Sequence, residues 1–211
     1  MKISGIDIEW LGHAGFKIKA KKKIIYIDPF KLKSVEKADL ADLILITHDH
    51  FDHCSIEDVK IIIKPDTIIV TVPECADKFT EMTTNIISVK PFEKIKVLDF
   101  DIETVPAYNK NKKFHLRANN WVGYIINAGK KIYHAGDTDL IEEMKKVHAD
   151  IALLPVSGTY VMTAEEAVEA AYIIKPKIAI PMHYGSLVGT NEDAQKFKEL
   201  LEQRGIKVVV L

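Results

Sequence analysis

Five ionisable side chains crowd into one short stretch, directly behind an apolar run. His48, Asp49, His50, Asp52 and His53 fill five of the six positions from 48 to 53. In an extended chain alternate residues point to the same side, so His48 and His50 face one way and Asp49 faces the other. Two imidazoles in that arrangement can hold one metal ion. A solvated polar loop is the alternative, but unliganded ionisable groups at the edge of a core would be costly.

A catalytic metal site needs further ligands from elsewhere in the chain and an open position for water. Asp137 in "HAGDTD" and His183 in "IPMHYG" each follow an apolar run typical of a strand. His115 lies in an irregular segment rich in lysine and asparagine. Ligands at the ends of buried strands would be held by a rigid frame. The sequence therefore predicts a metal site assembled from several strand ends.

The first half of the chain is rich in short strands. The runs "ISGIDIEW", "GFKIKA" and "KIIYID" predict a meander of hairpins. "DLILIT" and "TIIVTV" are continuous apolar runs, as in strands that are covered on both faces. Ser55 with Asp58 three residues later predicts a helix start, and a short helix is expected over 74–82.

The second half changes to an alternation of strands and helices. Residues 108–120 predict an irregular loop, and a hairpin follows with its turn at Ala128-Gly129. Thr163 with Glu166 predicts the start of one later helix, and Asn191 is predicted to cap the next. We expect a single domain over residues 1–211, with two packed sheets and the helices outside.

Composition and charge narrow the class of protein. The chain has 211 residues, is 47% hydrophobic and carries a formal net charge of -1. A net charge close to zero argues against broad nucleic-acid binding, so a nucleic-acid partner is not expected. Two cysteines make no disulfide framework. The apolar runs are too short to span a membrane, and no signal-peptide pattern stands at the amino terminus, so we expect a cytoplasmic protein.

The segment "THDHFDH" matches the T-H-x-H-x-D-H motif of the metallo-β-lactamase superfamily, which the chain resembles from Trp10 to Gly185. "WLGHAGF" and "YIDPF" precede the motif, and "YHAGDTD" and "IPMHYG" follow it. The resemblance implies an α+β fold, a four-layer αββα sandwich of two mixed sheets. The details resemble the branch that contains ascorbate-6-phosphate lactonase and N-acyl-phosphatidylethanolamine phospholipase D.

The resemblance also implies a binuclear site with seven ligands. Metal one would be held by His48, His50 and His115, metal two by Asp52, His53 and His183, and Asp137 would bridge both. If His115 is a loop residue instead, metal one lacks a ligand. Zinc is the favoured ion of both sites, with manganese, iron and nickel as alternatives. Asp52 and Asp137 would be the catalytic carboxylates.

Such a site implies a hydrolase in which a metal-bridging hydroxide attacks a small ester, lactone or phosphoester. The alternatives are a nuclease or phosphodiesterase of the same fold, and a non-catalytic metal-binding or redox partner module. We expect a small-molecule substrate, and the sequence leaves a homo-oligomer open.

Other polar residues are candidates for supporting the ligands or lining the pocket. They are His13, Asp28, His134 and Thr138. Metal-bound histidines usually donate their second N–H to a carboxylate or carbonyl, a role that Asp28 could fill. The alternative for His13 and Asp28 is a turn residue. Cys54 could ligate zinc, but a small buried hydrophobe is favoured because His53 fills the expected place.

Overall fold

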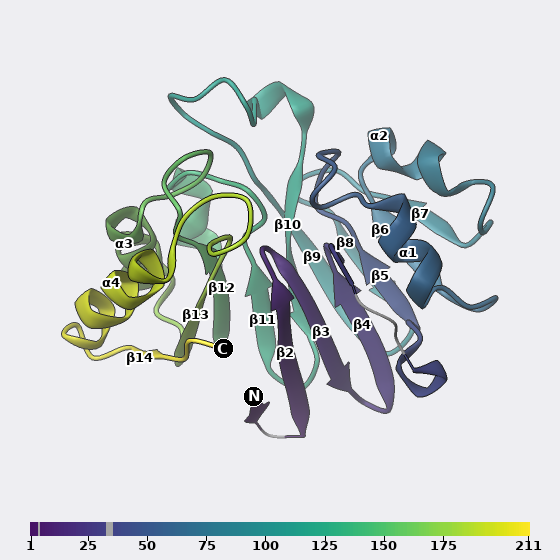
Figure 1. Ribbon diagram of the computed structural model, residues 1–211, viewed down its shortest axis with the longest axis horizontal. Helices are drawn as coiled ribbons and strands as arrows, with labels where there is room; N and C mark the ends of the chain where they lie inside the picture. Colours follow the sequence, from purple (N-terminus) through teal and green to yellow (C-terminus); the bar gives the residue numbers. More distant parts are fainter. Residues whose placement is uncertain (4, 33–35) are drawn as a thin grey trace. The chain divides into compact units, whose positions relative to one another are not determined.

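The computed structural model describes residues 1–3, 5–32 and 36–211, and the chain divides into two compact units, Met1–Lys90 and Pro91–Leu211. Each unit contains one mixed sheet of seven strands together with helices (Figure 1). The predicted α+β class with two mixed sheets is confirmed. That residues 1–211 act as a single domain stays a prediction.

The sheet of the first unit begins as a meander and ends as a parallel sheet. Its strands, in spatial and chain order, are β1 (Lys2–Ile3), β2 (Ile6–Gly12), β3 (Gly15–Ala20), β4 (Lys23–Ile27), β5 (Leu43–Leu45), β6 (Ile68–Thr71) and β7 (Ile86–Ser88). Strands β1 to β4 pair antiparallel, and β4 to β7 pair parallel. The apolar run that predicted a covered strand forms β5, which is wholly buried. The carboxyl ends of β4 and β5 therefore meet at one edge of this sheet.

Short helices connect the parallel strands of the first unit. Helix α1 (Ile56–Ile62) begins at the predicted cap, where Ser55 accepts a hydrogen bond from the N–H of Asp58. Helix α2 (Pro73–Ala76) is shorter than the helix expected over 74–82, because the chain tightens there into the 3₁₀ turn η2 (Asp77–Phe79). A second 3₁₀ turn, η1 (Lys37–Asp39), precedes β5.

The sheet of the second unit repeats the same order of pairings. Its strands are β8 (Lys94–Val97), β9 (Phe100–Pro106), β10 (Val122–Asn127), β11 (Lys131–His134), β12 (Ile151–Pro155), β13 (Ile178–Met182) and β14 (Lys207–Val208). Strands β8 to β11 pair antiparallel, and β11 to β14 pair parallel. The carboxyl ends of β11, β12 and β13 thus share one edge, where ligand sites of such sheets usually lie.

Two longer helices of the second unit pack on its parallel strands, α3 on β12 and α4 on β13 (Figure 1). Helix α3 (Ala164–Ile174) has the predicted capping box of Thr163 and Glu166. For α4 (Asn191–Glu202) the predicted cap was wrong by one residue. Thr190 is extended and its N–H donates to the Asp193 carboxylate at 2.8 Å, so Asn191 is already helical.

The remaining elements of the second unit are two 3₁₀ turns, η3 (Arg117–Asn119) and η4 (Glu142–Lys146). The predicted irregular loop over 108–120 is confirmed apart from η3. Within the described residues, the structure contains no helix with the length and apolar character needed to cross a bilayer.

Asp42 fixes the entry to β5 by an interaction that depends on pH. Its carboxylate accepts hydrogen bonds from the N–H of Ile24 at 2.8 Å and from Nζ of Lys64 at 2.7 Å. Burial alone would raise the pKa of Asp42, but these hydrogen bonds outweigh it and hold the pKa below its usual value. A lowered carboxyl pKa stabilises the fold above the unfolded value of about 3.9, and that contribution is lost as the pH falls through the folded value.

We therefore expect Asp42→Asn to lower the melting temperature at pH 7 by roughly 2–4 °C. The difference from wild type should shrink as the pH falls below about 4, because the wild-type carboxylate is then protonated too. Thermal unfolding at pH 7, 5 and 3 tests this, with exposed Asp66→Asn as the control. A difference that is the same at all three pH values would contradict the expectation.

Candidate functional site

The histidine-rich segment of the first unit leaves the buried end of β5. Thr47 and His48 are still almost fully buried, and the chain then turns through the exposed Phe51 to reach His53. Asp28 follows the neighbouring parallel strand β4 and has a left-handed backbone with φ of 44°. The ends of two adjacent strands thus bring the Asp28 carboxylate to the start of the segment.

The Asp28 carboxylate organises this segment. It accepts hydrogen bonds from the N–H of Thr47 at 2.8 Å, from the hydroxyl of Thr47 at 2.6 Å and from Nδ1 of His53 at 2.8 Å. Asp28 and His53 are both completely buried. Because the carboxylate accepts from Nδ1–H, the lone pair of His53 is on Nε2, which is the nitrogen that would coordinate a metal.

Thr47 sets the tautomer of His48 in the same way. Its hydroxyl proton goes to Asp28, so its oxygen accepts from Nδ1 of His48 at 2.9 Å. The lone pair of His48 is therefore on Nε2, and that atom lies 3.1 Å from Nδ1 of His50. The His48 ring centroid lies 4.0 Å from that of His53 and 4.8 Å from that of His50. Three imidazoles thus converge.

Asp49 faces away from this group, as the alternation of an extended chain predicts. Its carboxylate pairs with Lys78 and lies near Cys54 and Cys75. A hydrogen bond with Cys54, together with burial, raises the pKa of the Cys75 thiol. Cys54 and Cys75 are both buried, as expected for cysteines that act as small hydrophobes.

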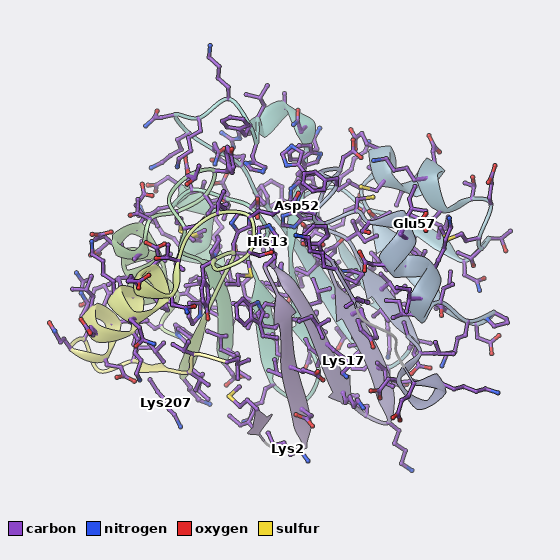
Figure 2. The ribbon with its side chains drawn as sticks, viewed as in Figure 1. Lys2, His13, Lys17, Asp52, Glu57 and Lys207 are labelled. Atoms are coloured by element: carbon purple, nitrogen blue, oxygen red, sulfur yellow. The ribbon has the colours of Figure 1, made fainter. Side chains whose placement is uncertain are left out.

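His13 positions Asp52. His13 occupies the turn between β2 and β3 with φ of 52°, and its Nε2 lies 2.8 Å from Oδ2 of Asp52. The indole N–H of Trp10 donates to the carbonyl oxygen of His13 at 2.9 Å and fixes the turn. Figure 2 shows His13 and Asp52 side by side at one end of the first sheet, with Lys2 at the other end.

The second unit brings three predicted ligands together. Asp137 follows β11, His183 follows β13, and His115 lies in the loop between β9 and β10. Oδ2 of Asp137 lies 3.3 Å from Nε2 of His115 and 3.0 Å from Nε2 of His183. All three side chains are at most 3% exposed. The structure therefore joins the carboxylate and both imidazoles of this unit in one buried cluster.

Asn109 fixes the orientation of His115. Its amide oxygen accepts from the N–H of His115 at 3.2 Å and from Nδ1 of the same ring at 3.0 Å. Its amide nitrogen donates to Asp139 at 3.1 Å and to the carbonyl of Tyr160 at 2.8 Å. The amide oxygen is therefore the end that faces the His115 ring. Since an amide oxygen only accepts, the lone pair of His115 is on Nε2, facing Asp137.

Ser157 supports His183 from the end of β12. Its hydroxyl lies 3.0 Å from Nδ1 of His183, which leaves Nε2 directed at Asp137. Thr47, Asn109 and Ser157 were not identified from the sequence as partners of the ligands. Single polar residues of these types are too common to predict such a contact, although each lies a few residues after the end of a strand, β5, β9 or β12.

We expect Ser157→Ala to weaken divalent-metal binding by roughly tenfold, because His183 loses the partner that holds its ring. Competition against a metal-sensitive dye would measure the affinity. Exposed Ser88→Ala in the first unit is the matched control and should bind as wild type does. Equal affinities for Ser157→Ala and wild type would contradict this role.

The other candidate residues have different surroundings. His134 is fully buried, and its Nδ1 accepts from the N–H of Gly136 at 3.2 Å. The hydroxyl of Thr138 lies 3.2 Å from the carbonyl oxygen of Tyr108 and 2.9 Å from that of Asp139. Thr138 thus ties the chain beside Asp137 to the loop that carries His115, rather than bonding to the Asp137 carboxylate itself.

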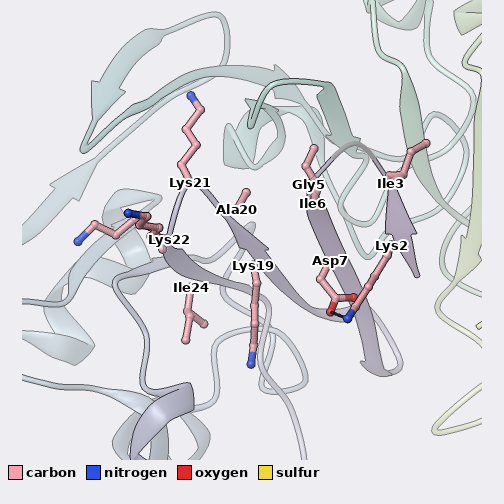
Figure 3. A pocket seen from close by; sticks show the side chains of 11 residues that line it. Lys2, Ile3, Gly5, Ile6, Asp7, Lys19, Ala20, Lys21, Lys22 and Ile24 are labelled. Atoms are coloured by element: carbon pink, nitrogen blue, oxygen red, sulfur yellow. Dashed lines mark ion pairs between the residues drawn. The ribbon is translucent and has the colours of Figure 1, made fainter.

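A cavity of about 570 Å³ in the first unit is separate from these groups. Side chains of the β1–β2 and β3–β4 turns line it, including Lys2, Lys21 and Lys22 (Figure 3). It lies at the end of β2 opposite to His13, and the seven residues of that strand span about 20 Å. None of the lining residues is a predicted ligand.

Comparisons with known proteins agree with the fold. A family model described as the beta-lactamase superfamily domain matches residues 7–183. The chain is 36% identical to the UPF0173 metal-dependent hydrolase TV0864 of Thermoplasma volcanium, over 97% of this chain and 95% of that protein. It is 34% identical to the UPF0173 metal-dependent hydrolase PF1764 of Pyrococcus furiosus, over 98% and 96% respectively.

Solved structures agree with these relatives. A proposed metal-dependent hydrolase from Parabacteroides distasonis has a TM-score of 0.84 at 31% identity, and the match covers 97% of this chain and 92% of that chain. Igni18, a metallo hydrolase from Ignicoccus hospitalis, has a TM-score of 0.81 at 28% identity, with coverage of 98% and 94%. The chain therefore belongs to the metallo-β-lactamase superfamily and, within it, to the UPF0173 family of metal-dependent hydrolases. The resemblance identified from "THDHFDH" is confirmed at the level of the superfamily.

Proposed function

We propose that the chain hydrolyses a small ester, lactone or phosphoester with the help of two divalent metal ions. His48, His50 and His115 would hold metal one, Asp52, His53 and His183 would hold metal two, and Asp137 would contribute to both. The observation that carries this proposal is the set of fixed tautomers. Asp28, Thr47 and Asn109 hold the Nδ1 atoms of three buried histidines and so assign each lone pair to Nε2.

The donor set fits such ions. Neutral imidazole with carboxylate suits zinc, and also manganese, iron and nickel, with zinc favoured for this set. Partners that hold the second nitrogen of a ligating ring are the usual companions of metal sites. His50 is the exception in its geometry, because its Nδ1 faces Nε2 of His48. His50 would therefore coordinate through Nδ1.

Bound divalent ions would supply Lewis-acid activation of water and of the scissile group. The chain's own carboxylates then have distinct tasks. Asp52 orients the attacking water and accepts its proton at Oδ2, and His13 holds that oxygen in place at 2.8 Å. Asp137 keeps the Nε2 atoms of His115 and His183 within 3.3 Å of one oxygen, so both rings face a common point. We further propose that the protein acts in the cytoplasm on a small molecule.

The test measures the hydrolysis of a panel of substrates by purified protein. The protein is first freed of metal with a chelator and then reloaded separately with zinc, manganese, iron or nickel. We expect hydrolysis of at least one ester, lactone or phosphodiester that is lost on stripping and restored by one of the ions. Metal-loaded protein that is inert toward the whole panel would contradict the proposal and favour a non-catalytic metal-binding module.

A further inference from the structure

We infer that Asp139 is a positioning residue for His115, and thereby for the metal ion that His115 would bind. Asp139 acts through the loop between β9 and β10, which carries His115 and which the carboxylate and the N–H of Asp139 hold in place. This role rests on the proposed function, because His115 is one of the proposed ligands. All of the contacts that carry it lie within the second unit.

The loop that carries His115 needs support from outside itself. Residues 107–116 contain no helix or strand, and Figure 1 shows this part of the chain as a teal excursion beyond the ends of β9 and β10. His115 is 1% exposed, whereas its neighbours Phe114 and Leu116 are exposed. A segment without a ladder of backbone hydrogen bonds keeps one side chain buried only where other groups fix its course. The position of His115 therefore depends on the contacts of the loop.

Asp139 holds this loop at four positions. Its N–H donates to the carbonyl oxygen of Tyr108 at 3.0 Å. Its carboxylate accepts from the side-chain amide of Asn109 at 3.1 Å and from the N–H of Lys110 at 2.9 Å, and it pairs with the ammonium group of Lys112. Asp139 is 3% exposed, so these donors satisfy a carboxylate that water barely reaches. One buried residue thus fixes the start of the loop.

Asn109 connects Asp139 to the proposed ligand. While its Nδ2 donates to Asp139, its Oδ1 accepts from the N–H and from Nδ1 of His115, at 3.2 Å and 3.0 Å. An amide turned end over end would offer its N–H₂ group to Nδ1 of the ring. The proton of the ring would then be on Nε2, the nitrogen that faces Asp137 at 3.3 Å. The Asp139 carboxylate opposes that turn, because it only accepts hydrogen bonds.

The contacts of Asp139 require a carboxylate rather than an amide. Its Oδ1 faces Nδ2 of Asn109 and Nζ of Lys112. Its Oδ2 faces the N–H of Lys110, so donors stand at both oxygens. Lys112 also donates to the carbonyl oxygen of Val161 at 3.1 Å, which ties the ion pair to the chain before α3. Asp139→Asn keeps the shape but turns an N–H₂ group toward one of these donors, so it should disturb the loop.

NMR spectroscopy of the metal-free protein, combined with zinc titration, tests this role. In wild type the Nδ1–H proton of His115 should exchange slowly with solvent and give a resolved signal, because it is buried and hydrogen-bonded. In Asp139→Ala we expect that proton to exchange at least about tenfold faster. We also expect one zinc ion to bind roughly 10- to 100-fold more weakly. Asp139→Asn should show smaller changes in the same direction, and it is the variant to use if Asp139→Ala does not fold.

Asp150→Ala is the control for a general loss of stability. The Asp150 carboxylate also accepts from a backbone N–H, that of Lys131 at 3.0 Å, and from a lysine ammonium group, that of Lys177 at 2.8 Å. It lies in the same unit but precedes the amino end of β12, whereas the proposed ligands follow the carboxyl ends of β11 and β13. Asp150→Ala should lower the melting temperature and leave the Nδ1–H signal and the zinc affinity as in wild type.

The outcomes separate this role from the proposed function. A wild-type exchange rate in both Asp139 variants would overturn the inference and leave the proposed function standing. Faster exchange with unchanged zinc affinity would also overturn it, because the position of His115 would then not matter to the metal ion. Equal changes in Asp139→Ala and Asp150→Ala would show a general loss of stability and overturn it as well. Wild-type protein that binds no zinc would overturn the proposed function and the inference together.

Discussion

Replacing Asp137 with asparagine is expected to lower kcat/KM for the metal-dependent hydrolysis on the order of 10³-fold, with the fold retained. Asparagine has nearly the shape of aspartate but lacks its charge. Oδ2 of Asp137 stands 3.3 Å from Nε2 of His115 and 3.0 Å from Nε2 of His183. In the proposed site the Asp137 carboxylate would help to hold both ions, so loss of its charge should weaken the binding of both.

Steady-state kinetics at saturating metal, combined with circular dichroism, would measure this effect. Asp101→Asn is the matched control, because Asp101 lies exposed on β9 of the same unit. Hydrolysis by Asp137→Asn at the wild-type rate would show that this carboxylate has no bridging role. If Asp137→Asn is unfolded, as shown by the absence of a melting transition, Asp137→Glu takes its place. We expect Asp137→Glu to remain folded and to lose only part of the activity.

Asp28→Ala is expected to destabilise the metal-free protein by about 3–5 kcal/mol. The substitution leaves the Thr47 N–H, the Thr47 hydroxyl and Nδ1 of His53 without their acceptor in a fully buried place. Alanine also tolerates the left-handed backbone at this position, φ of 44°, less well than aspartate or asparagine does. Asp28→Asn keeps the shape and the backbone preference, so its cost should be smaller.

Denaturant unfolding in the presence of a chelator would give these free energies without a contribution from bound metal. Exposed Asp66→Asn controls for the loss of one negative charge. We further expect Asp28→Asn to weaken metal binding roughly 10- to 100-fold, since the His53 ring is no longer oriented by a carboxylate. Unchanged stability of Asp28→Ala would show that Asp28 is only a turn residue before Pro29.

The strand ends that carry the proposed ligands could be predicted as strand ends, because a short apolar run that stops abruptly at ionisable groups is typical of a buried strand reaching the edge of its sheet. The motif at 48–53 and the cap at Thr163 depend on local sequence alone. The prediction that Asn191 caps α4 was wrong by one residue. Thr190 and Asn191 are both good cap residues, and only the extended backbone of Thr190 decides between them.

Of the residues that orient the proposed ligands, Asp28 was a candidate from the sequence, but Thr47, Asn109 and Ser157 could not be predicted, because their contacts depend on how the chain folds. Asn109 reaches His115 from the other end of a loop, and Ser157 reaches His183 across neighbouring parallel strands. For Thr47 the contact is local, but the direction of its hydroxyl depends on Asp28, which comes from the adjacent strand. Such partners become visible only when the pairing of the strands is known.

The most direct test of the account counts the metal ions. Protein reconstituted with zinc, freed of excess ion and analysed by mass spectrometry for metals, should contain two equivalents per chain. His53→Ala in the first unit and His115→Ala in the second should each lose about one equivalent, while His148→Ala, which changes an exposed histidine, should keep two. Wild-type protein that takes up no zinc, or both ligand variants retaining two equivalents, would contradict the account.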